Sequence, residues 1–201
     1  MKMAQKTSGF TLLEVMVSVS IIAIVVGVLV GMSIGLGDTA RVRDIKGASA
    51  DEARRAMIFL TRDLRQASVA SLSGAPGDSI SFRMAADVSG NGTAVNVGGN
   101  LELGPVITVG RDVNDLNNDG LTDSQLIWSD GVNHRVLANN LLPNENPDAA
   151  GNWDPAVDDA NRGVWFNRNG SLVEVIIQTG GQDRRGRQIN FNLREVVRPR
   201  N

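Results

Sequence analysis

The stretch GFTLLEVMVSVSIIAIVVGVLVG, residues 9–31, decides the architecture of this chain of 201 residues. Between Phe10 and Gly37 the only ionisable side chain is that of Glu14. Because an α-helix rises about 1.5 Å per residue, about twenty such residues span the roughly 30 Å of hydrocarbon in a bilayer. We therefore expect residues 10–37 to cross a membrane as one helix.

The charges beside this segment predict its orientation. Lys2 and Lys6 precede it, so the amino end is expected to stay in the cytoplasm and the rest of the chain to be exported. Arg41, Arg43 and Lys46 follow the segment and weaken that prediction. We expect a single-pass membrane protein whose carboxy-terminal part is exported.

Glu14 needs an explanation that a plain membrane anchor does not supply. An ionised carboxylate in hydrocarbon costs on the order of a few kcal/mol, so such groups are usually paired, protonated or functional. A cleaved secretory signal peptide is a further alternative, since Ala-Ser-Ala at residues 48–50 has the small-residue form of a cleavage site. However, charged residues at 41–46 separate that site from the apolar run, which is itself too long for a usual signal peptide.

The residues themselves carry a family resemblance. Two lysines, then GFTLLE at residues 9–14 and a long apolar run, resemble the class III leader of type IV pilins and type II secretion pseudopilins. In that family a prepilin peptidase cuts after the glycine, here Gly9, and methylates the new amino terminus, here Phe10. The family's glutamate is the fifth mature residue, which is the place of Glu14. The resemblance implies a leader at residues 1–9 and a single-pass protein of the inner membrane whose carboxy-terminal domain lies in the periplasm.

Cleavage at this point explains the carboxylate. The new α-amino group of Phe10 is a cation at the head of a helix, and Glu14 lies about one turn away. Within one chain, or between a chain and its neighbour in a filament, the two charges neutralise each other. Since an unpaired charge there would cost several kcal/mol, the pair would fix the register of docking. Alternatively, the Glu14 side chain reaches the lipid headgroups.

Three glycines lie on one face of the same helix. Gly27, Gly31 and Gly35 repeat at every fourth residue, a spacing that lets helices approach closely in lipid. Ordinary use of glycine in membrane helices also explains them. Many major pilins have a proline near the position of Gly31, and this chain does not, which favours a minor subunit over the bulk subunit of a pilus.

The next segment, residues 38–72, has the pattern of an amphipathic stem helix. Its apolar residues alternate steps of four and three and form one stripe, with the charged residues, among them Arg62 and Asp63, expected on a solvated face of the helix. The stripe consists of Ala53, Met57, Leu60, Leu64 and Ala67. The sequence MIFLTRDLRQA at residues 57–67 also resembles the stem of PilW-like minor pilins and GspJ-like pseudopilins. We expect the stripe to pack on a sheet.

The remainder, residues 73–201, is expected to be a β-rich head. Glycine-rich and asparagine-rich turns separate short runs of alternating polarity, which is typical of antiparallel strands and hairpins. The runs lie at residues 79–84, 164–166, 171–177 and 189–197, with a turn at 167–170. The predicted fold class is therefore α+β: a long amino-terminal helix packed on an antiparallel β-sheet, which is also the pilin fold that the resemblance implies.

The head contains one candidate metal loop, DLNNDGLTD at residues 115–123. Its oxygen donors are spaced as in the first nine positions of a calcium loop, with Gly120 at the sharp turn. The donors are Asp115, Asn117, Asp119, the Leu121 carbonyl and Asp123. The twelfth position is Leu126 rather than glutamate, so the loop is no EF-hand, and Asp112 or Asp130 would have to complete the shell. The alternative is a surface turn rich in Asn, Asp and Gly.

Composition and motifs disfavour other classes of function. The absence of cysteine excludes disulfides and thiolate metal sites, and a formal net charge of -2 argues against a nucleic-acid surface. His134 is the only histidine, and the chain has no nucleophile elbow or phosphate loop. We predict no catalytic site and no cofactor other than calcium.

We therefore expect a minor pilin that primes assembly or forms the tip of a type IV pilus. Its expected partners are prepilin peptidase, other major and minor pilins, the inner-membrane assembly platform and the lipid bilayer, with the filament at the cell surface as its final location. One alternative is a pseudopilin of a type II secretion system. Another, of a different class, is a membrane-tethered, calcium-dependent binding module.

Overall fold

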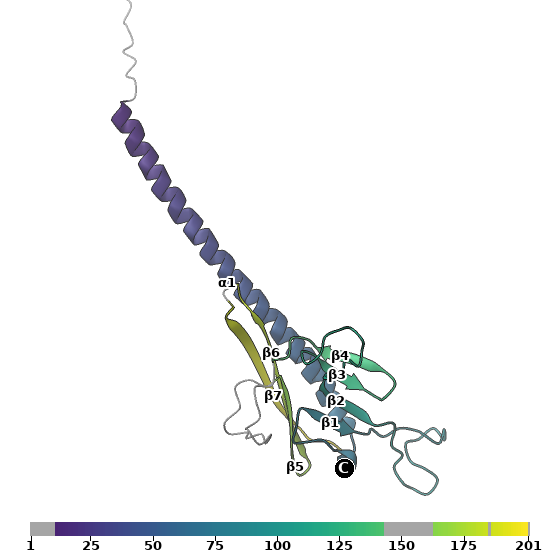
Figure 1. The fold of residues 1–201 in the computed structure, drawn as a ribbon. Coiled ribbons are helices and arrows are strands. Elements are labelled where there is room, and N and C mark those ends of the chain that lie inside the picture. The colour runs from purple at the N-terminus through teal and green to yellow at the C-terminus, as the bar shows by residue number, and fades with distance from the viewer. Residues whose placement is uncertain (1–10, 143–162, 185, 201) are drawn as a thin grey trace, which may run out of the picture. The chain divides into compact units, whose positions relative to one another are not determined.

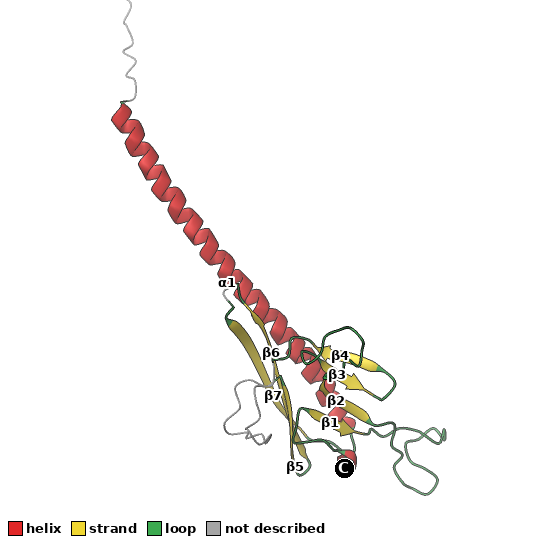
Figure 2. Ribbon diagram, viewed as in Figure 1, coloured by secondary structure: helices red, strands yellow, loops and turns green. Residues whose placement is uncertain are grey.

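The computed structural model describes residues 11–142, 163–184 and 186–200. The chain divides into two compact units, Met1–Arg43 and Asp44–Asn201. One helix, α1 (Leu12–Gln66), passes through the boundary between them without a break. Figure 1 and Figure 2 show it as the long coiled ribbon. The predicted membrane segment and the predicted stem are therefore parts of one helix.

In the first unit, α1 accommodates its hydroxyl groups by local hydrogen bonds. The Ser18 hydroxyl donates to the Glu14 carbonyl at 2.7 Å, and the Ser20 hydroxyl donates to the Met16 carbonyl at 2.8 Å. Such bonds to the preceding turn satisfy a polar group without a partner outside the helix. By length and composition α1 is able to cross a membrane, as the sequence predicts.

The described residues of the second unit form seven strands and one short 3₁₀ turn, η1. The strands form two antiparallel sheets, with the orders β1-β2-β3-β4 and β5-β6-β7. The first sheet consists of β1 (Ser79–Phe82), β2 (Ile107–Arg111), β3 (Leu126–Ser129) and β4 (His134–Ala138). The second consists of β5 (Val164–Asn169), β6 (Leu172–Gln182) and β7 (Gln188–Val197), and η1 spans Val69–Ser71. The α+β class is confirmed, with two sheets where the sequence predicts one.

The two sheets meet through a short bridge. The Gly77 N–H donates to the Phe166 carbonyl at 2.9 Å, and the Phe166 N–H donates back to Gly77 at 2.7 Å. Gly77 and Phe166 form an isolated bridge, and Gly77 lies outside the named strands. The pairing is therefore confined to this isolated bridge and does not continue into one sheet.

The predicted stripe on α1 forms the core with both sheets. Ala53, Leu60 and Leu64 are completely buried, and Ile80 and Phe82 of β1 are buried with them. The second sheet contributes Phe166, Val173, Val175 and Ile177 to the same cluster. Because apolar burial is the main favourable term in folding, this stripe is what holds the stem half of α1 to the head.

Two features of the stem differ from the sequence prediction. The α-helix ends at Gln66, before the predicted boundary at residue 72. It ends there because Ala67 and Ser68 enter β-bridges, and the Ser68 N–H donates to the Arg83 carbonyl at 3.0 Å. Asp63 is buried, with 5% of its surface exposed, and its Oδ1 accepts two hydrogen bonds from the Arg62 guanidinium at 3.2 Å each.

The strands agree with the sequence prediction in some places and differ from it in others. The predicted hairpin of β5 and β6 is present, but its turn lies at Gly170, with a φ of 61°, and Asn169 still pairs with Leu172. Strand β7 confirms the alternating run at its end of the chain. No strand is predicted from the sequence at β2 or β3, because these runs are short and bury polar groups such as Arg111 and Ser129 among apolar ones.

Candidate functional site

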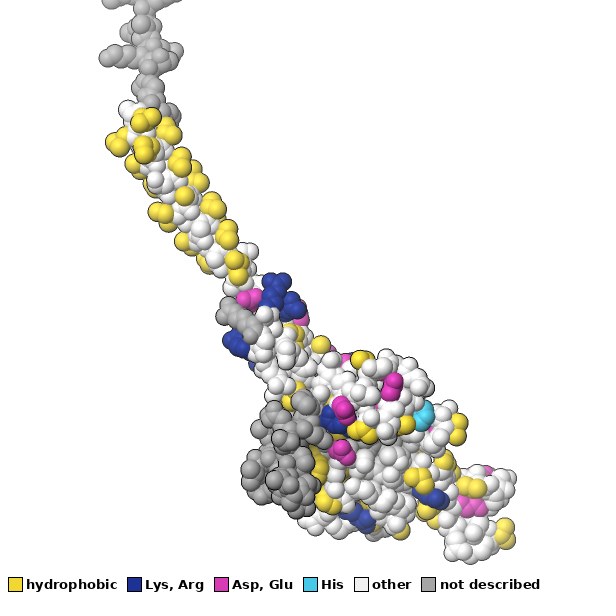
Figure 3. All heavy atoms as spheres, viewed as in Figure 1, with side chains coloured by type: hydrophobic (Ala, Val, Ile, Leu, Met, Phe, Trp, Pro, Cys, Tyr) yellow, Lys and Arg dark blue, Asp and Glu magenta, His cyan; other side chains and the backbone are white. Residues whose placement is uncertain are grey.

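The first unit exposes an almost continuous apolar surface. Every large apolar side chain from Leu12 to Leu36 keeps at least half of its surface exposed, including Leu13 at 72% and Ile24 at 68%. Figure 3 shows these hydrophobic side chains along the helix, followed by a group of basic and acidic ones. An apolar surface of this extent needs lipid or another protein to cover it. The described part of this unit is therefore a surface for insertion or assembly.

Glu14 lies in the first turn of this helix. Its backbone N–H bonds to the Thr11 carbonyl at 3.1 Å and to the Thr11 hydroxyl at 3.3 Å. Thr11 thus caps the helix, and Thr-Leu-Leu-Glu has the spacing of a capping box, a signal that the sequence analysis missed. A carboxylate in a first turn is also favoured by the helix dipole.

The predicted cleavage and methylation residues, Gly9 and Phe10, lie outside the described residues. The predicted charge pair between the Phe10 amino group and Glu14 therefore stays a prediction. Farther along α1, a side-chain carbon added at Gly27, Gly31 or Gly35 would meet nothing within 4 Å. Their face is open in the single chain, and its contact with other helices also stays a prediction.

The predicted calcium loop connects β2 to β3. Asp115 has a φ of 51°, and its carboxylate accepts hydrogen bonds from the Asp119 N–H at 2.9 Å and from the Gly120 N–H at 3.1 Å. The Asp119 carboxylate accepts from the Leu121 N–H at 2.9 Å and from the Gln125 amide at 2.8 Å. The Gln125 bond is the main reason why the pKa of Asp119 lies below its ordinary value. The loop is thus ordered by its own donors.

Asn117 joins the same network, since its amide donates to the Asp119 carboxylate at 2.8 Å. Asp123 is held through its backbone: its N–H donates to the Asp112 carbonyl at 2.7 Å, and Arg111 donates to its carbonyl. No three acidic or histidine side chains converge into a metal cluster in the described ranges of the chain. Calcium binding at this loop remains a prediction.

The structure distinguishes the two residues considered for completing the shell. Asp112 borders the loop, is completely buried, and accepts the Leu116 N–H at 3.0 Å. Asp130 lies at the other end of β3, in the turn to β4, where its carboxylate accepts the Val132 and Asn133 N–H groups at 2.9 and 2.7 Å. These bonds, with Asn133 the largest cause, lower the pKa of Asp130 to about 2. Asp130 belongs to its own turn.

Two residues that the sequence analysis missed organise this region. Gln125 is 2% exposed and bonds to Asn139 at 2.9 Å as well as to Asp119. Arg111 is buried, and its guanidinium donates to the Leu142 carbonyl at 2.7 Å. Burial lowers the pKa of Arg111, although the charges of Asp123 and Asp78 oppose that change. A polar residue at the end of a short apolar strand, as Arg111 is, or directly before one, as Gln125 is, is the signal that would have found both.

His134 begins β4 and is exposed. A family model described as the prokaryotic N-terminal methylation motif matches residues 5–30 of the chain. No curated protein and no solved structure shows significant similarity to it. The chain therefore carries a prepilin-type N-terminal methylation motif at the start of a helix able to cross a membrane, as pilin-like and pseudopilin-like proteins do.

Proposed function

We propose that this chain is a minor pilin of a type IV pilus, a non-enzymatic subunit that primes assembly or lies near the filament tip. The observation that carries the proposal is the methylation motif at residues 5–30, which includes the start of a helix whose apolar surface is uncovered. Prepilin peptidase would remove residues 1–9 and methylate Phe10. The subunit would then wait in the inner membrane until the assembly platform extracts it.

Glu14 has a specific part in this proposal. In the filament, neighbouring helices would replace the lipid around the apolar surface of residues 10–37. Apolar contact alone does not fix the axial position of a subunit relative to its neighbours. The charge pair between Glu14 and a Phe10 amino group would fix this axial position, because a misplaced subunit leaves both charges unpaired. The absence of a proline near Gly31 and the PilW-like stem support a minor subunit over a major one.

The closest competing proposal is a pseudopilin of a type II secretion system, which is built from the same parts. The two differ in the filament that contains the chain. Filaments are sheared from cells with intact type IV pili and probed for the full chain, and the same is done with cells that lack the retractable pilus but secrete normally. Presence in sheared pili supports the proposal, and presence only in secretion-dependent filaments supports the alternative. A chain that stays wholly with the membranes contradicts both.

A further inference from the structure

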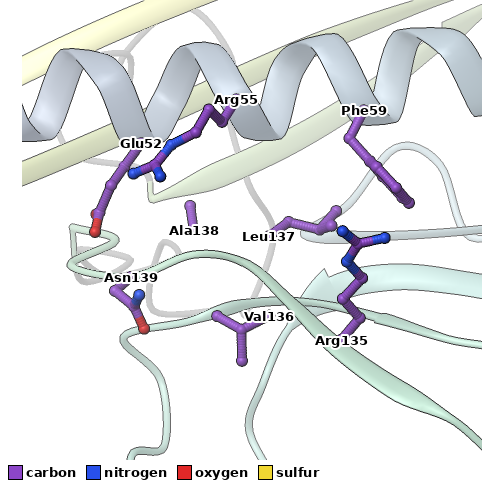
Figure 4. Close-up of a pocket in the computed structure, with 8 residues that line it drawn as sticks. All are labelled: Glu52, Arg55, Phe59, Arg135, Val136, Leu137, Ala138 and Asn139. Carbon is purple, nitrogen blue, oxygen red and sulfur yellow. The ribbon is translucent and has the colours of Figure 1, made fainter.

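A groove on the second unit lies between α1 and the outer edge of β4. It encloses about 320 Å³ and is lined by Glu52, Arg55 and Phe59 of α1 and by Arg135 and residues 136–139 of the facing segment. Figure 4 shows the side chains of α1 reaching down toward this segment, with Arg135 rising toward Phe59. The α1 residues of the groove, at steps of three and four, form a second stripe beside the buried one.

One wall of this α1–β4 groove is an open strand edge. In the order β1-β2-β3-β4, strand β4 pairs with β3 on one side, and no other strand of the described residues pairs with it. An edge strand presents backbone N–H and C=O groups that another extended chain is able to pair with. The groove thus supplies main-chain partners along one side.

The side chains of the groove select what enters it. Within the described residues, neither Arg55 nor Arg135 forms an ion pair with a carboxylate. Arg55 donates only its Nε–H to the Asp51 carbonyl, at 3.3 Å, and the Arg135 guanidinium lies over the Phe59 ring at 4.8 Å from its centroid. Two guanidinium groups are therefore available to an acidic group.

The groove also contains an acceptor without a donor. Glu52 Oε2 is buried and has no hydrogen-bond partner in the described structure. A buried polar atom of this kind is costly to leave unpaired, and a backbone N–H from an incoming strand would satisfy it. Glu52 with Arg55 and Arg135 still leaves the groove with one net positive charge, which is complementary to an acidic segment.

We propose that the α1–β4 groove binds an extended, acidic segment of a neighbouring filament subunit, which pairs with the edge of β4 and places a carboxylate between Arg55 and Arg135. From Glu52 to Phe59 the helix rises about 10 Å, a length that about three residues of extended chain cover. This inference rests on the proposed function, since its occupant is another subunit of the same filament.

The test uses the full chain in sheared filaments. Phe59 is replaced by the photoreactive analogue p-benzoylphenylalanine, which keeps an aromatic ring in the groove. Phe191 is the matched control, because it is also half-buried and lies beneath an arginine, Arg54, at 6.0 Å on β7. After irradiation, the peptide joined to the probe is sequenced. We expect an Asp- or Glu-containing segment of another subunit with a methylation motif at position 59 and not at position 191.

A second set of variants tests the charges. With the probe at position 59, R55E/R135E should reduce the adduct about tenfold, the size of effect expected when an ion pair at an interface is lost. R54E, at a neighbouring exposed arginine, should leave it unchanged, and R55K/R135K should retain most of it. If the reversed variant is degraded, the milder R55Q/R135Q replaces it with the same expectation of a reduced adduct.

The outcomes separate the inference from the proposed function. A chain that is present in filaments but gives no adduct at position 59, or the same adduct at 59 and 191, overturns the groove inference alone. An adduct that R55E/R135E leaves undiminished, or one on lipid or on the chain itself, also overturns it. A chain that never enters any filament overturns the proposed function and the inference together.

Discussion

The two parts of α1 are made from the same kinds of apolar residue and differ in what covers them. Between Leu12 and Leu36 the large apolar side chains stay at least half exposed, whereas Met57, Leu60 and Leu64 are at most 2% exposed. In the stem, charged residues share the helix with a single apolar stripe, and the head covers that stripe. The first part is apolar on all sides, so its cover must come from lipid or other subunits.

Substitutions in the first part of α1 and in its stem half should therefore have different consequences. A change in the stem stripe alters the stability of the head, because the head is what it contacts. A change in the first part should leave the head intact and alter insertion or assembly.

The largest expected effect is that of Glu14→Ala on assembly. The substitution removes the charge that would meet the Phe10 amino group, so processing should continue while incorporation into sheared filaments is lost. Immunoblots of membranes and of the sheared fraction measure both. Val15→Ala, at an exposed apolar position next to it, should incorporate normally. Normal incorporation of Glu14→Ala would remove the charge-pair argument.

A second substitution tests the stem half. Leu60→Ala should lower the free energy of unfolding by about 2–5 kcal/mol, because it leaves a cavity in the core. Ile58→Ala, at a helix position that is 70% exposed, should change it by less than about 0.5 kcal/mol. Denaturant unfolding of the full chain in detergent, followed by tryptophan fluorescence, is suitable because all three tryptophans lie beyond residue 100. Equal effects of the two substitutions would refute the distinction between covered and uncovered sides.

Calcium binding would add a ligand-dependent contribution to the stability of the head alone. If the loop at residues 115–123 binds calcium, saturation at about 100 times the Kd stabilises the head by about 2.7 kcal/mol. Chelation should then lower the tryptophan-detected melting temperature of the wild-type chain, and Asp115→Asn/Asp119→Asn should abolish that response. An unchanged wild-type melt after chelation would show that the loop is held by its own hydrogen bonds.

The smallest expected effect concerns the turn between β3 and β4. The pKa of Asp130 falls from 3.8 to about 2 on folding, so its ionised form stabilises the head. This contribution is fully present above pH 3.8 and is lost as the pH falls through about 2. Asp130→Asn should therefore melt at a lower temperature than wild type near neutral pH, and the difference should shrink between pH 4 and pH 2. A difference that grows on acidification would contradict this assignment.

The sequence predicts those parts of the molecule whose pattern is long or local. The 55-residue helix carries many repeats of its apolar spacing, and the hairpin of β5 and β6 has its glycine at the turn. Strands β2 and β3 have five and four residues, too few to show a period, and each depends on pairing with distant segments. The prediction for Asp63 was wrong for a similar reason, since only tertiary structure shows that the head covers it.

For the candidate sites, sequence supplied residue types and the structure supplied partners. The donors of the loop at residues 115–123 are visible in the sequence, but the contribution of Gln125, which reaches Asp119 and Asn139, depends on the packing of β3. The α1–β4 groove has no sequence signal, because α1 ends at Gln66 and β4 begins only at His134, far along the chain.

The central claim is that a new, positively charged amino terminus at Phe10 accounts for Glu14 in an apolar helix. Intact-mass and peptide mass spectrometry of the chain purified from its native membranes tests it most directly. We expect a chain that begins with N-methylated Phe10, and a Gly9→Ala variant that keeps its first nine residues. A native chain that still begins at Met1 would contradict the claim.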